Sequence, residues 1–433
     1  MDENFDFLKE EVKKQKPYEK WLKRTGVAAF AGLVAGLVIL LIMVFVYPRL
    51  DDAVNGEKKE SVALAEQTSS LPENETEASF LSSSVISDLT EEEEKDDKEE
   101  KDVSEPVKEE TTAERLSAMS SDLTALADSR KKSLVTVIGV TEDKDWFNQT
   151  YENQGQLSGL IVAKQDKAYY ILTEYRVLKD VNRIMVTFVD GSTADGRYVK
   201  HDEKTGLAVI RVDTEDVAKE TRKQISPIEL EQKVSVNQGQ AVIALGSPLG
   251  YSDSMAVGLV TSVSNEINVT DNTYGILNTD IPVSEEGSGI LLDMEGNVIG
   301  IMAQKLTDTK GLKLMSCLPV SQIYEEIENL CNNEDIPYIG ITGQTVGEEI
   351  SERTGIPKGI WVDQVDKDSP AMVTGIQSGD VIVQVGSSTV ENMKAFHSVL
   401  RHVETGQKLV IHAMRQSVEG YVEMEFEITV QAR

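Results

Sequence analysis

The 433-residue sequence predicts a mostly β protein with two folded domains, preceded by one membrane-spanning helix and an acidic linker. Three observations predict this fold class. Short β-rich runs separated by turn residues follow one another from Ser133 onward. A last segment of about 100 residues, from Asp335, combines further strands with a turn-rich stretch and one helix. A single long apolar run lies near the N-terminus.

The apolar run, Val27 to Tyr47, contains 21 residues without a charged side chain. As a helix it is long enough to cross a hydrocarbon core of roughly 30 Å. Six basic residues precede it between Lys13 and Arg24, so the positive-inside rule places the N-terminus in the cytoplasm. We expect a cytoplasmic segment over residues 1–25, an uncleaved transmembrane helix over residues 26–47 and extracytoplasmic domains after it. A cleaved signal peptide is the alternative, but no A-x-A site follows the run.

The segment after the apolar run is strongly acidic. Residues 51–110 contain 21 acidic and 6 basic side chains, a net charge of 6 − 21 = −15. Such a segment cannot bury enough apolar surface to offset its chain entropy, and its charges repel one another. We expect a disordered linker over residues 48–128, with a cation-binding site as the weaker alternative. The net charge of the whole chain, −31, argues against nucleic acid as a partner, because phosphates require clustered Lys and Arg.

Residues 129–333 form the first predicted domain and residues 334–433 the second. The β-rich runs of the first include SGLIVAK, AYYILT, GLAVIRV, AVIALGSPLG and NVIGIMA, and this pattern indicates a β-barrel or sandwich. One helix, PVSQIYEEIENLC, closes the domain. Cys317 and Cys331 lack metal-ligand spacing, and free thiols are favoured over a disulfide. The four histidines are too scattered for a metal site, and no cofactor is expected.

Several motifs of the chain stand in a characteristic order. They are YILTEYRVL, DEKTGLAVIRVD, ALGSPLG, GLVTSV and NTDIPVSEEGSGILLDMEGNVIGI, followed by YIGITG and GIPKGIWVDQVDKDSPAMVTGIQSGDVIVQV. In order, spacing and residue type, this series resembles the HtrA/Deg-type family of trypsin-like serine proteases with a C-terminal PDZ domain. The resemblance covers residues 133–433. It implies a chymotrypsin-like double β-barrel followed by a PDZ domain, in a family that commonly forms trimers.

The resemblance also implies where a catalytic triad would lie. Arg176 takes the position of the general base, and a guanidinium stays protonated at physiological pH, so it cannot accept a proton. Gly206 takes the position of the acid that orients the base, and it has no side chain. Ser288 takes the position of the nucleophile when counted from the NTD motif, whereas Gly287 takes it when counted back from EGNVIGI. We therefore expect a degenerate triad at Arg176, Gly206 and Ser288.

The loop around Ser288 departs from the family pattern as well. The segment EEGSGI is one residue shorter after the serine, and Glu286 replaces a glycine whose N–H normally helps to bind the oxyanion. Glu285 adds a second negative charge beside it. A relocated base at His201 or a Ser-Lys dyad is the weaker alternative. The lysines considered for such a dyad are Lys164, Lys167 and Lys179.

The second domain has two candidate peptide-binding elements. The segment YIGI takes the position of the PDZ loop whose backbone N–H groups capture a terminal carboxylate. Its residues are Tyr338, Ile339, Gly340 and Ile341. On the predicted helix after Val390, one face carries Met393, Phe396, His397 and Leu400. Spacing alone favours core packing for this face, whereas the resemblance favours a peptide groove lined by Met393, Phe396 and Leu400.

Together these features predict a membrane-anchored, extracytoplasmic HtrA-like pseudoprotease of the bacterial cell envelope. We expect its PDZ domain to bind peptide or protein C-termini and unfolded proteins, in protein quality control, sensing or scaffolding. Two alternatives remain at this point. One is an active HtrA-type serine endopeptidase with a rearranged site. The other is a regulatory subunit of an active homologue, in a homotrimer or mixed oligomer.

The predicted orientation is tested by adding external protease to intact cells. Because the basic flank precedes Val27 and the acidic linker follows Tyr47, we expect the protease to remove the folded domains. A cytoplasmic marker protein must stay intact in the same sample. A C-terminal epitope that remains protected until the cells are permeabilised would contradict the orientation.

Overall fold

The computed structural model describes residue 64 and residues 111–144, 150–306 and 313–433. The predicted transmembrane helix and most of the acidic linker lie outside the described residues. Two compact units divide the chain, and every described residue belongs to the unit Val62–Arg433. In the described part of the chain, no helix combines the length and the apolar character needed to cross a membrane.

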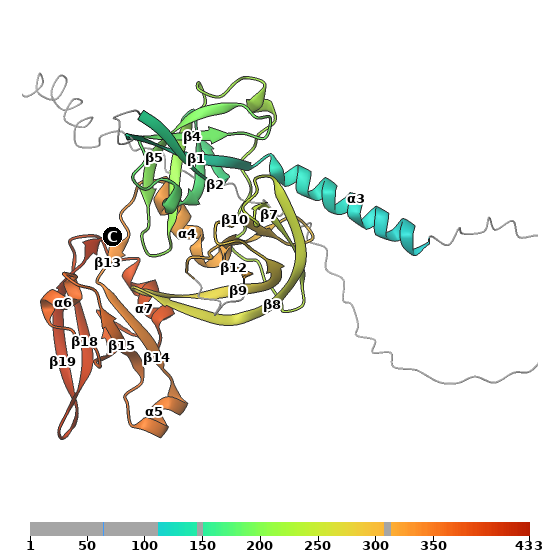
Figure 1. Cartoon of the computed structure of the whole chain (residues 1–433). Helices are drawn as coiled ribbons and strands as arrows, with labels where there is room; N and C mark the ends of the chain where they lie inside the picture. The colour runs from blue at the N-terminus through green and yellow to red at the C-terminus, as the bar shows by residue number, and fades with distance from the viewer. Residues whose placement is uncertain (1–63, 65–110, 145–149, 307–312) are drawn as a thin grey trace, which may run out of the picture. The chain divides into compact units, whose positions relative to one another are not determined.

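The first domain consists of two closed six-stranded antiparallel barrels (Figure 1). The first barrel has the order β1-β2-β3-β6-β5-β4, and the second has the order β10-β11-β12-β9-β8-β7. The strands of the first are β1 (Leu134–Lys144), β2 (Thr150–Gln165), β3 (Ala168–Glu174), β4 (Arg183–Thr187), β5 (Thr193–His201) and β6 (Leu207–Asp213). Those of the second are β7 (Ala241–Ser247), β8 (Ser254–Val269), β9 (Asn272–Pro282), β10 (Ser288–Leu292), β11 (Val298–Met302) and β12 (Leu314–Pro319). The predicted double barrel is confirmed.

Three apolar cores stabilise the double barrel. One fills the first barrel and includes Ile171 and Ile210, and another fills the second and includes Leu291 and Cys317. The third lies between the barrels and beneath helix α4 (Val320–Cys331), the helix that was predicted to close this domain. Strands such as β3 are apolar on both faces because one face lines a barrel and the other packs in the core between the barrels. Cys317 and Cys331 are buried free thiols, as predicted.

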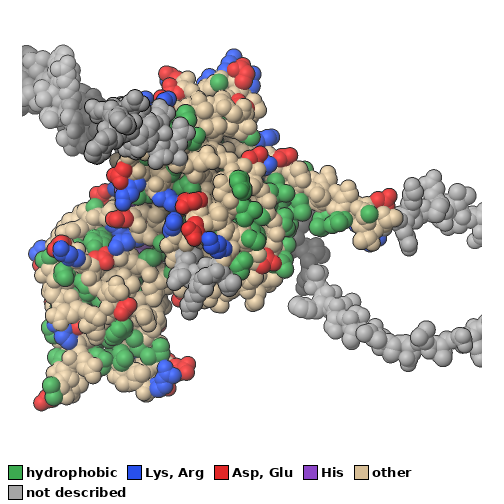
Figure 2. All heavy atoms as spheres, in the orientation of Figure 1, with side chains coloured by type: hydrophobic (Ala, Val, Ile, Leu, Met, Phe, Trp, Pro, Cys, Tyr) green, Lys and Arg blue, Asp and Glu red, His purple; other side chains and the backbone are tan. Residues whose placement is uncertain are grey.

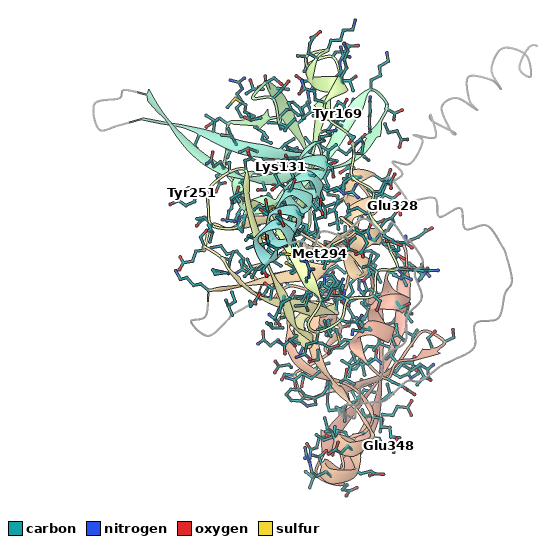
Figure 3. The ribbon with its side chains drawn as sticks, turned by 90° about the vertical axis from the view of Figure 1, so that its right-hand side faces the viewer. Lys131, Tyr169, Tyr251, Met294, Glu328 and Glu348 are labelled. Carbon is teal, nitrogen blue, oxygen red and sulfur yellow. The ribbon has the colours of Figure 1, made fainter. Side chains whose placement is uncertain are left out.

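Helix α3 (Thr112–Lys131) precedes the first barrel and corrects the predicted linker, which was placed over residues 48–128. A capping box between Thr111 and Glu114 starts the helix. At its other end Ala127 is buried in the core between the barrels, and Lys131 (Figure 3) lies 2.9 Å from Asp253 on the turn before β8. The sequence does not mark this helix by an apolar face, because its first half is exposed and mostly polar.

The second domain is a small sheet covered by helices. Its sheet has the order β14-β15-β16-β18-β19, with β17 added to β16, and a short pair β13-β20. Its strands are β13 (Pro337–Tyr338), β14 (Ile341–Val346), β15 (Gly359–Val365), β16 (Val381–Val385), β17 (Ser388–Thr389), β18 (Lys408–Ser417), β19 (Gly420–Thr429) and β20 (Gln431–Ala432). Its helices are α5 (Glu348–Thr354), α6 (Pro370–Thr374) and α7 (Met393–Leu400). β14 is an edge strand of this sheet.

The hairpin formed by β8 and β9 is unusually long. β8 has 16 residues, and Val269 pairs with Asn272 across a turn of only two residues, Thr270 and Asp271. Asp271 has φ +63°, a left-handed conformation that aspartate adopts more readily than most residues. The hairpin therefore extends beyond its own barrel, and its strands contact β14 and α7.

Candidate active site and peptide-binding loop

The structure brings the three positions aligned with a triad to one place between the barrels. Arg176 lies in the short 3₁₀ turn η2 (Tyr175–Val177), directly after β3. The backbone N–H of Tyr175 donates to the carbonyl of Gly206 over 2.7 Å. The Arg176 guanidinium donates through Nη2 to the carbonyl of Gly287 over 3.3 Å, directly before Ser288. A guanidinium therefore occupies the space beside the serine.

Arg176 is the centre of an ion-pair cluster. Its Nε lies 2.8 Å from Oε2 of Glu174, and its Nη1 pairs with Glu286. The side chains of Arg176 and Glu174 are 23% and 17% exposed, so their pair is partly shielded from water. Burial raises the pKa of Glu174, and the neighbouring guanidinium opposes this rise. The cluster fixes the loop before Ser288, but neither of its carboxylates is hydrogen-bonded to that serine.

Ser288 begins β10 and is only 1% exposed. Its Oγ accepts a hydrogen bond from the backbone N–H of Ser158 over 2.8 Å. The hydroxyl of Ser158 in turn lies 3.1 Å from that of Ser247. A nucleophilic serine needs a base within hydrogen-bond reach of its hydroxyl. In the described part of the chain, the hydroxyl of Ser288 is hydrogen-bonded to the Ser158 N–H and to no histidine, lysine or carboxylate.

The loop before Ser288 is a tight turn. The N–H of Gly287 donates to the carbonyl of Ser284 over 3.0 Å, so this N–H is used inside the turn. Glu285 and Glu286 occupy the tip of the turn, with side chains 75% and 71% exposed. A Cβ at Gly287 would lie 2.4 Å from Val283, which explains why the turn requires glycine there. Two exposed carboxylates at this tip oppose the binding of an oxyanion.

The alternative bases considered from the sequence make other contacts. His201 stacks on the ring of Tyr175, with ring centroids 3.5 Å apart, and its Nδ1 is hydrogen-bonded to the hydroxyl of Tyr198. Burial lowers the pKa of His201. Lys164 lies over the ring of Tyr169, at the opposite end of β3 from Arg176. Gly206 has φ +73° in a turn where its N–H donates to Asp202, so a side chain at this position would be strained.

The YIGI loop binds a carboxylate of the chain itself. The backbone N–H groups of Ile339, Gly340 and Ile341 all donate to the side chain of Asp271, over 2.9 to 3.1 Å. The carbonyls of Ile339 and Gly340 accept from Ala371 and Asp366, which holds the loop in this conformation. Gly340 has φ +91°, and a Cβ there would lie 2.3 Å from Ser369. The loop therefore has the geometry expected of a carboxylate-binding site.

Sequence reasoning missed Asp271, which is 1% exposed. The pair Thr270 and Asp271 between two β-rich runs is a turn signal. That signal gives no indication that the turn reaches a loop 68 or more residues away. Burial raises the pKa of the Asp271 carboxyl, while the three backbone N–H groups act in the opposite direction.

The flanks of this contact are held by a second carboxylate. Asp366 accepts from the hydroxyl of Tyr338 over 3.0 Å and from that of Thr270 over 3.1 Å, and it pairs with Lys204 over 2.8 Å. Burial raises the pKa of Tyr338. The C-terminal Arg433 donates to the carbonyl of Thr270 over 3.1 Å. The tip of the hairpin is therefore fixed from both sides.

The groove predicted from α7 needs correction. Met393, Phe396 and Leu400 are at most 1% exposed and belong to the apolar core of the second domain. They pack inward because that face of α7 covers the sheet, as spacing alone suggested. His397 instead lies toward the hairpin, and burial lowers its pKa to about 4.

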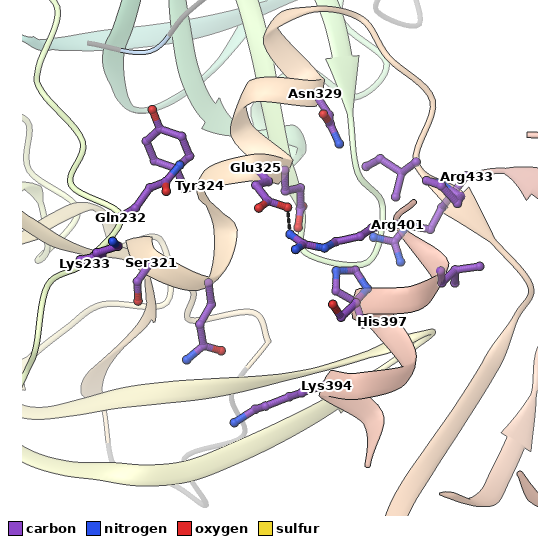
Figure 4. A pocket seen from close by; sticks show the side chains of 16 residues that line it. Gln232, Lys233, Ser321, Tyr324, Glu325, Asn329, Lys394, His397, Arg401 and Arg433 are labelled. Carbon is purple, nitrogen blue, oxygen red and sulfur yellow. Dashed lines mark ion pairs between the residues drawn. The ribbon is translucent and has the colours of Figure 1, made fainter. Parts of the chain in front are cut away.

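A cavity of about 410 Å³ lies between α4 and α7. Figure 4 shows His397 and Lys394 of α7, with Arg401 directly after this helix, lining it opposite Tyr324 and Glu325 of α4. Arg401 pairs with Glu325 across it. An ion pair, rather than close apolar packing, connects the two segments here.

The fold and these sites define a trypsin-like double barrel joined to a PDZ domain. The trypsin-like peptidase domain family matches residues 157–301, and the PDZ domain family matches residues 337–428. The serine protease Do-like HtrB of Bacillus subtilis (strain 168) is 28% identical over 320 residues, which cover 67% of this chain and 68% of the relative. A probable periplasmic DegP-like serine endoprotease of Halomonas elongata is 27% identical over 264 residues, covering 60% of this chain and 53% of the relative.

A solved structure, the HtrA-type protease AlgW with decapeptide, has the same fold. Its TM-score is 0.53 at 21% sequence identity, over 71% of this chain and 98% of that chain. The present chain covers about half to two thirds of the length of the two curated relatives. The fold and the matches together support an HtrA-type chain with a trypsin-like serine protease domain and a PDZ domain.

The Arg176 cluster predicts a measurable energetic coupling. We expect Arg176→Gln to lower the free energy of unfolding by about 1–3 kcal/mol, because it leaves the shielded Glu174 carboxylate without its partner. Adding Glu174→Gln should recover part of this loss, because no charge is then left unpaired. Chemical denaturation of the two single variants and the double variant measures the coupling.

Arg183→Gln is the matched control. Arg183 pairs with Asp195, and both side chains are about 60% exposed, so the change should cost less than about 1 kcal/mol. If Arg176→Gln costs no more than this control and shows no coupling to Glu174, the cluster contributes nothing to stability.

Proposed function

We propose that this chain is a membrane-anchored, extracytoplasmic HtrA-type pseudoprotease that recognises peptide or protein C-termini through its PDZ domain. The observation that carries this proposal is the Arg176 cluster. At the position that the family resemblance assigns to the general base stands a protonated guanidinium, held by Glu174 and Glu286. Ser288 accepts a hydrogen bond from a backbone N–H instead of donating to a base.

The peptide-binding part of the proposal rests on the YIGI loop. Three convergent N–H groups already bind a carboxylate, which is the chemistry that a peptide C-terminus would require. The neighbouring β14 offers an edge for an extended peptide. The AlgW structure contains a decapeptide. By analogy, C-termini and unfolded proteins of the cell envelope are the partners of this chain.

The membrane anchor is supported by the uncharged run from Val27 to Tyr47 and its basic flank. A regulatory role in a trimer or a mixed oligomer is a second candidate. It is favoured by apolar side chains exposed on α3, where Leu116 and Met119 are 62% and 55% exposed. Figure 2 shows hydrophobic side chains at the surface along this helix. Co-purification with an active relative separates this role from a solitary one.

The active endopeptidase is the alternative that a serine probe tests. We expect no labelling of the purified full-length chain by a fluorophosphonate and no cleavage of casein, because in the described residues no side-chain base is hydrogen-bonded to the hydroxyl of Ser288. An active HtrA-type protease serves as the positive control. Labelling that disappears in Ser288→Ala would refute the pseudoprotease proposal.

Peptide binding is tested with a peptide ending in a free apolar residue and its amidated twin. We expect a Kd of order micromolar for the free form, equivalent to about −8 kcal/mol, and weaker binding of the amide. Gly340→Ala should abolish binding, because the added Cβ meets Ser369 and distorts the loop. Gly355→Ala is the matched control, since Gly355 also has positive φ but no atom lies within 4 Å of its Cβ position. Equal affinity for the two peptides would exclude the YIGI loop as the carboxylate site.

A further inference from the structure

Asp271 makes two kinds of contact with the PDZ domain at once. Its carboxylate accepts from the N–H groups of Ile339, Gly340 and Ile341. Its own backbone N–H donates to the carbonyl of Ile341 over 2.7 Å. The last residue of a peptide that adds to β14 would present the same two groups to this loop: a carboxylate and, beside it, a backbone N–H. Asp271 therefore imitates a chain terminus although it lies in the middle of the chain.

We infer that Asp271 is an internal ligand of the PDZ domain, and that peptide C-termini bind only by displacing it and the tip of the β8–β9 hairpin. This inference rests on the proposed peptide-binding function and adds its regulation. Because the loop cannot accept two carboxylates, the hairpin and a peptide exclude each other. The apparent affinity for a peptide is then the intrinsic affinity multiplied by the fraction of molecules in which the hairpin tip is not bound to the YIGI loop.

The contacts around the hairpin tip allow it to bind the YIGI loop and also to dissociate from it. The contacts of Thr270 in the tip with Asp366 and Arg433 are polar, so water can replace them when the tip leaves. On the exposed side, Lys394 of α7 pairs with Glu266 of β8 over 2.7 Å, with both side chains more than half exposed. Burial raises the pKa of the Asp271 carboxyl, so removing its ionised form from water on binding to the loop costs free energy.

The geometry also defines the competitor. A displacing ligand must bring a free carboxylate with a backbone N–H beside it, which a chain terminus supplies without any special fold. An internal segment could supply both groups only by placing an acidic residue in a tight turn, as the hairpin does. Peptide C-termini are therefore the competing class, and amidated peptides are poor competitors.

Two variants test the inference in the full-length chain. Asp271→Gly removes the carboxylate while keeping a residue that adopts φ +63° without strain. Asp271→Asn keeps the shape and removes the charge. Asp253→Gly is the matched control, because Asp253 has φ +59° in the turn before β8 and its side chain is 74% exposed. The probe is a fluorescent decapeptide that ends in a free valine carboxylate, together with its amidated form.

We expect Asp271→Gly to bind the free peptide at least about tenfold more tightly than the wild type, with a smaller gain for Asp271→Asn. Asp253→Gly should match the wild type. If the Asp271 variants and the wild type bind the free peptide with the same affinity, the inference is wrong while the proposed peptide binding stands.

Amide hydrogen exchange separates this failure from a failure of the proposed function. In the wild type, the amides of Ile339, Gly340 and Ile341 should exchange at least about tenfold more slowly than in Asp271→Gly. The amides of Ile360 and Ile382 in the core strands should be unchanged. If Asp271→Gly loses the protection of these amides but neither protein binds the peptide, the result supports the internal ligand and contradicts the proposed function. Equal protection in both proteins overturns the internal ligand.

Discussion

The buried carboxylate of Asp271 decides how the second barrel and the PDZ domain meet. A charge leaves water at tolerable cost only where donors replace its hydration. Three backbone N–H groups of one loop do so here. A second buried pair lies behind it, where Arg433 donates to Asp202 over 2.7 Å. Because both contacts join parts far apart in the chain, the position of the PDZ domain depends on a small number of charged groups.

These charges form a continuous polar network at the junction. Glu326 of α4 accepts from the hydroxyls of Thr205 and Tyr274, each over 2.6 Å. Burial raises the pKa of Glu326, and the neighbouring charge of Asp202 raises it further. Arg433 compensates for this accumulation of carboxyl groups. A network of this kind specifies one arrangement of the domains because every misplaced group would lose its partners.

At the position that the family resemblance assigns to the general base, the structure has an arginine that is paired with two carboxylates. General-base catalysis requires a group that can alternate between two protonation states. Arg176 pairs with Glu174 and Glu286, and it connects the end of β3 to the loop before Ser288. Strand β9 runs from Asn272, next to the internal carboxylate, to Pro282, shortly before that loop. The two sites are therefore connected by one strand, although they carry unrelated chemistry.

The sequence by itself determined the class of fold, since the motifs and the period of apolar residues indicated the double barrel, α4 and the PDZ domain. It also identified Arg176, Gly206, Ser288 and the YIGI loop as the positions to inspect. It did not predict α3, because this helix is anchored only by a few contacts at its C-terminal end. It could not identify Asp271, because the role of a turn aspartate depends on which N–H groups it meets. That is decided by the length of the β8–β9 hairpin and by the docking of two domains, and neither is a local property of the chain.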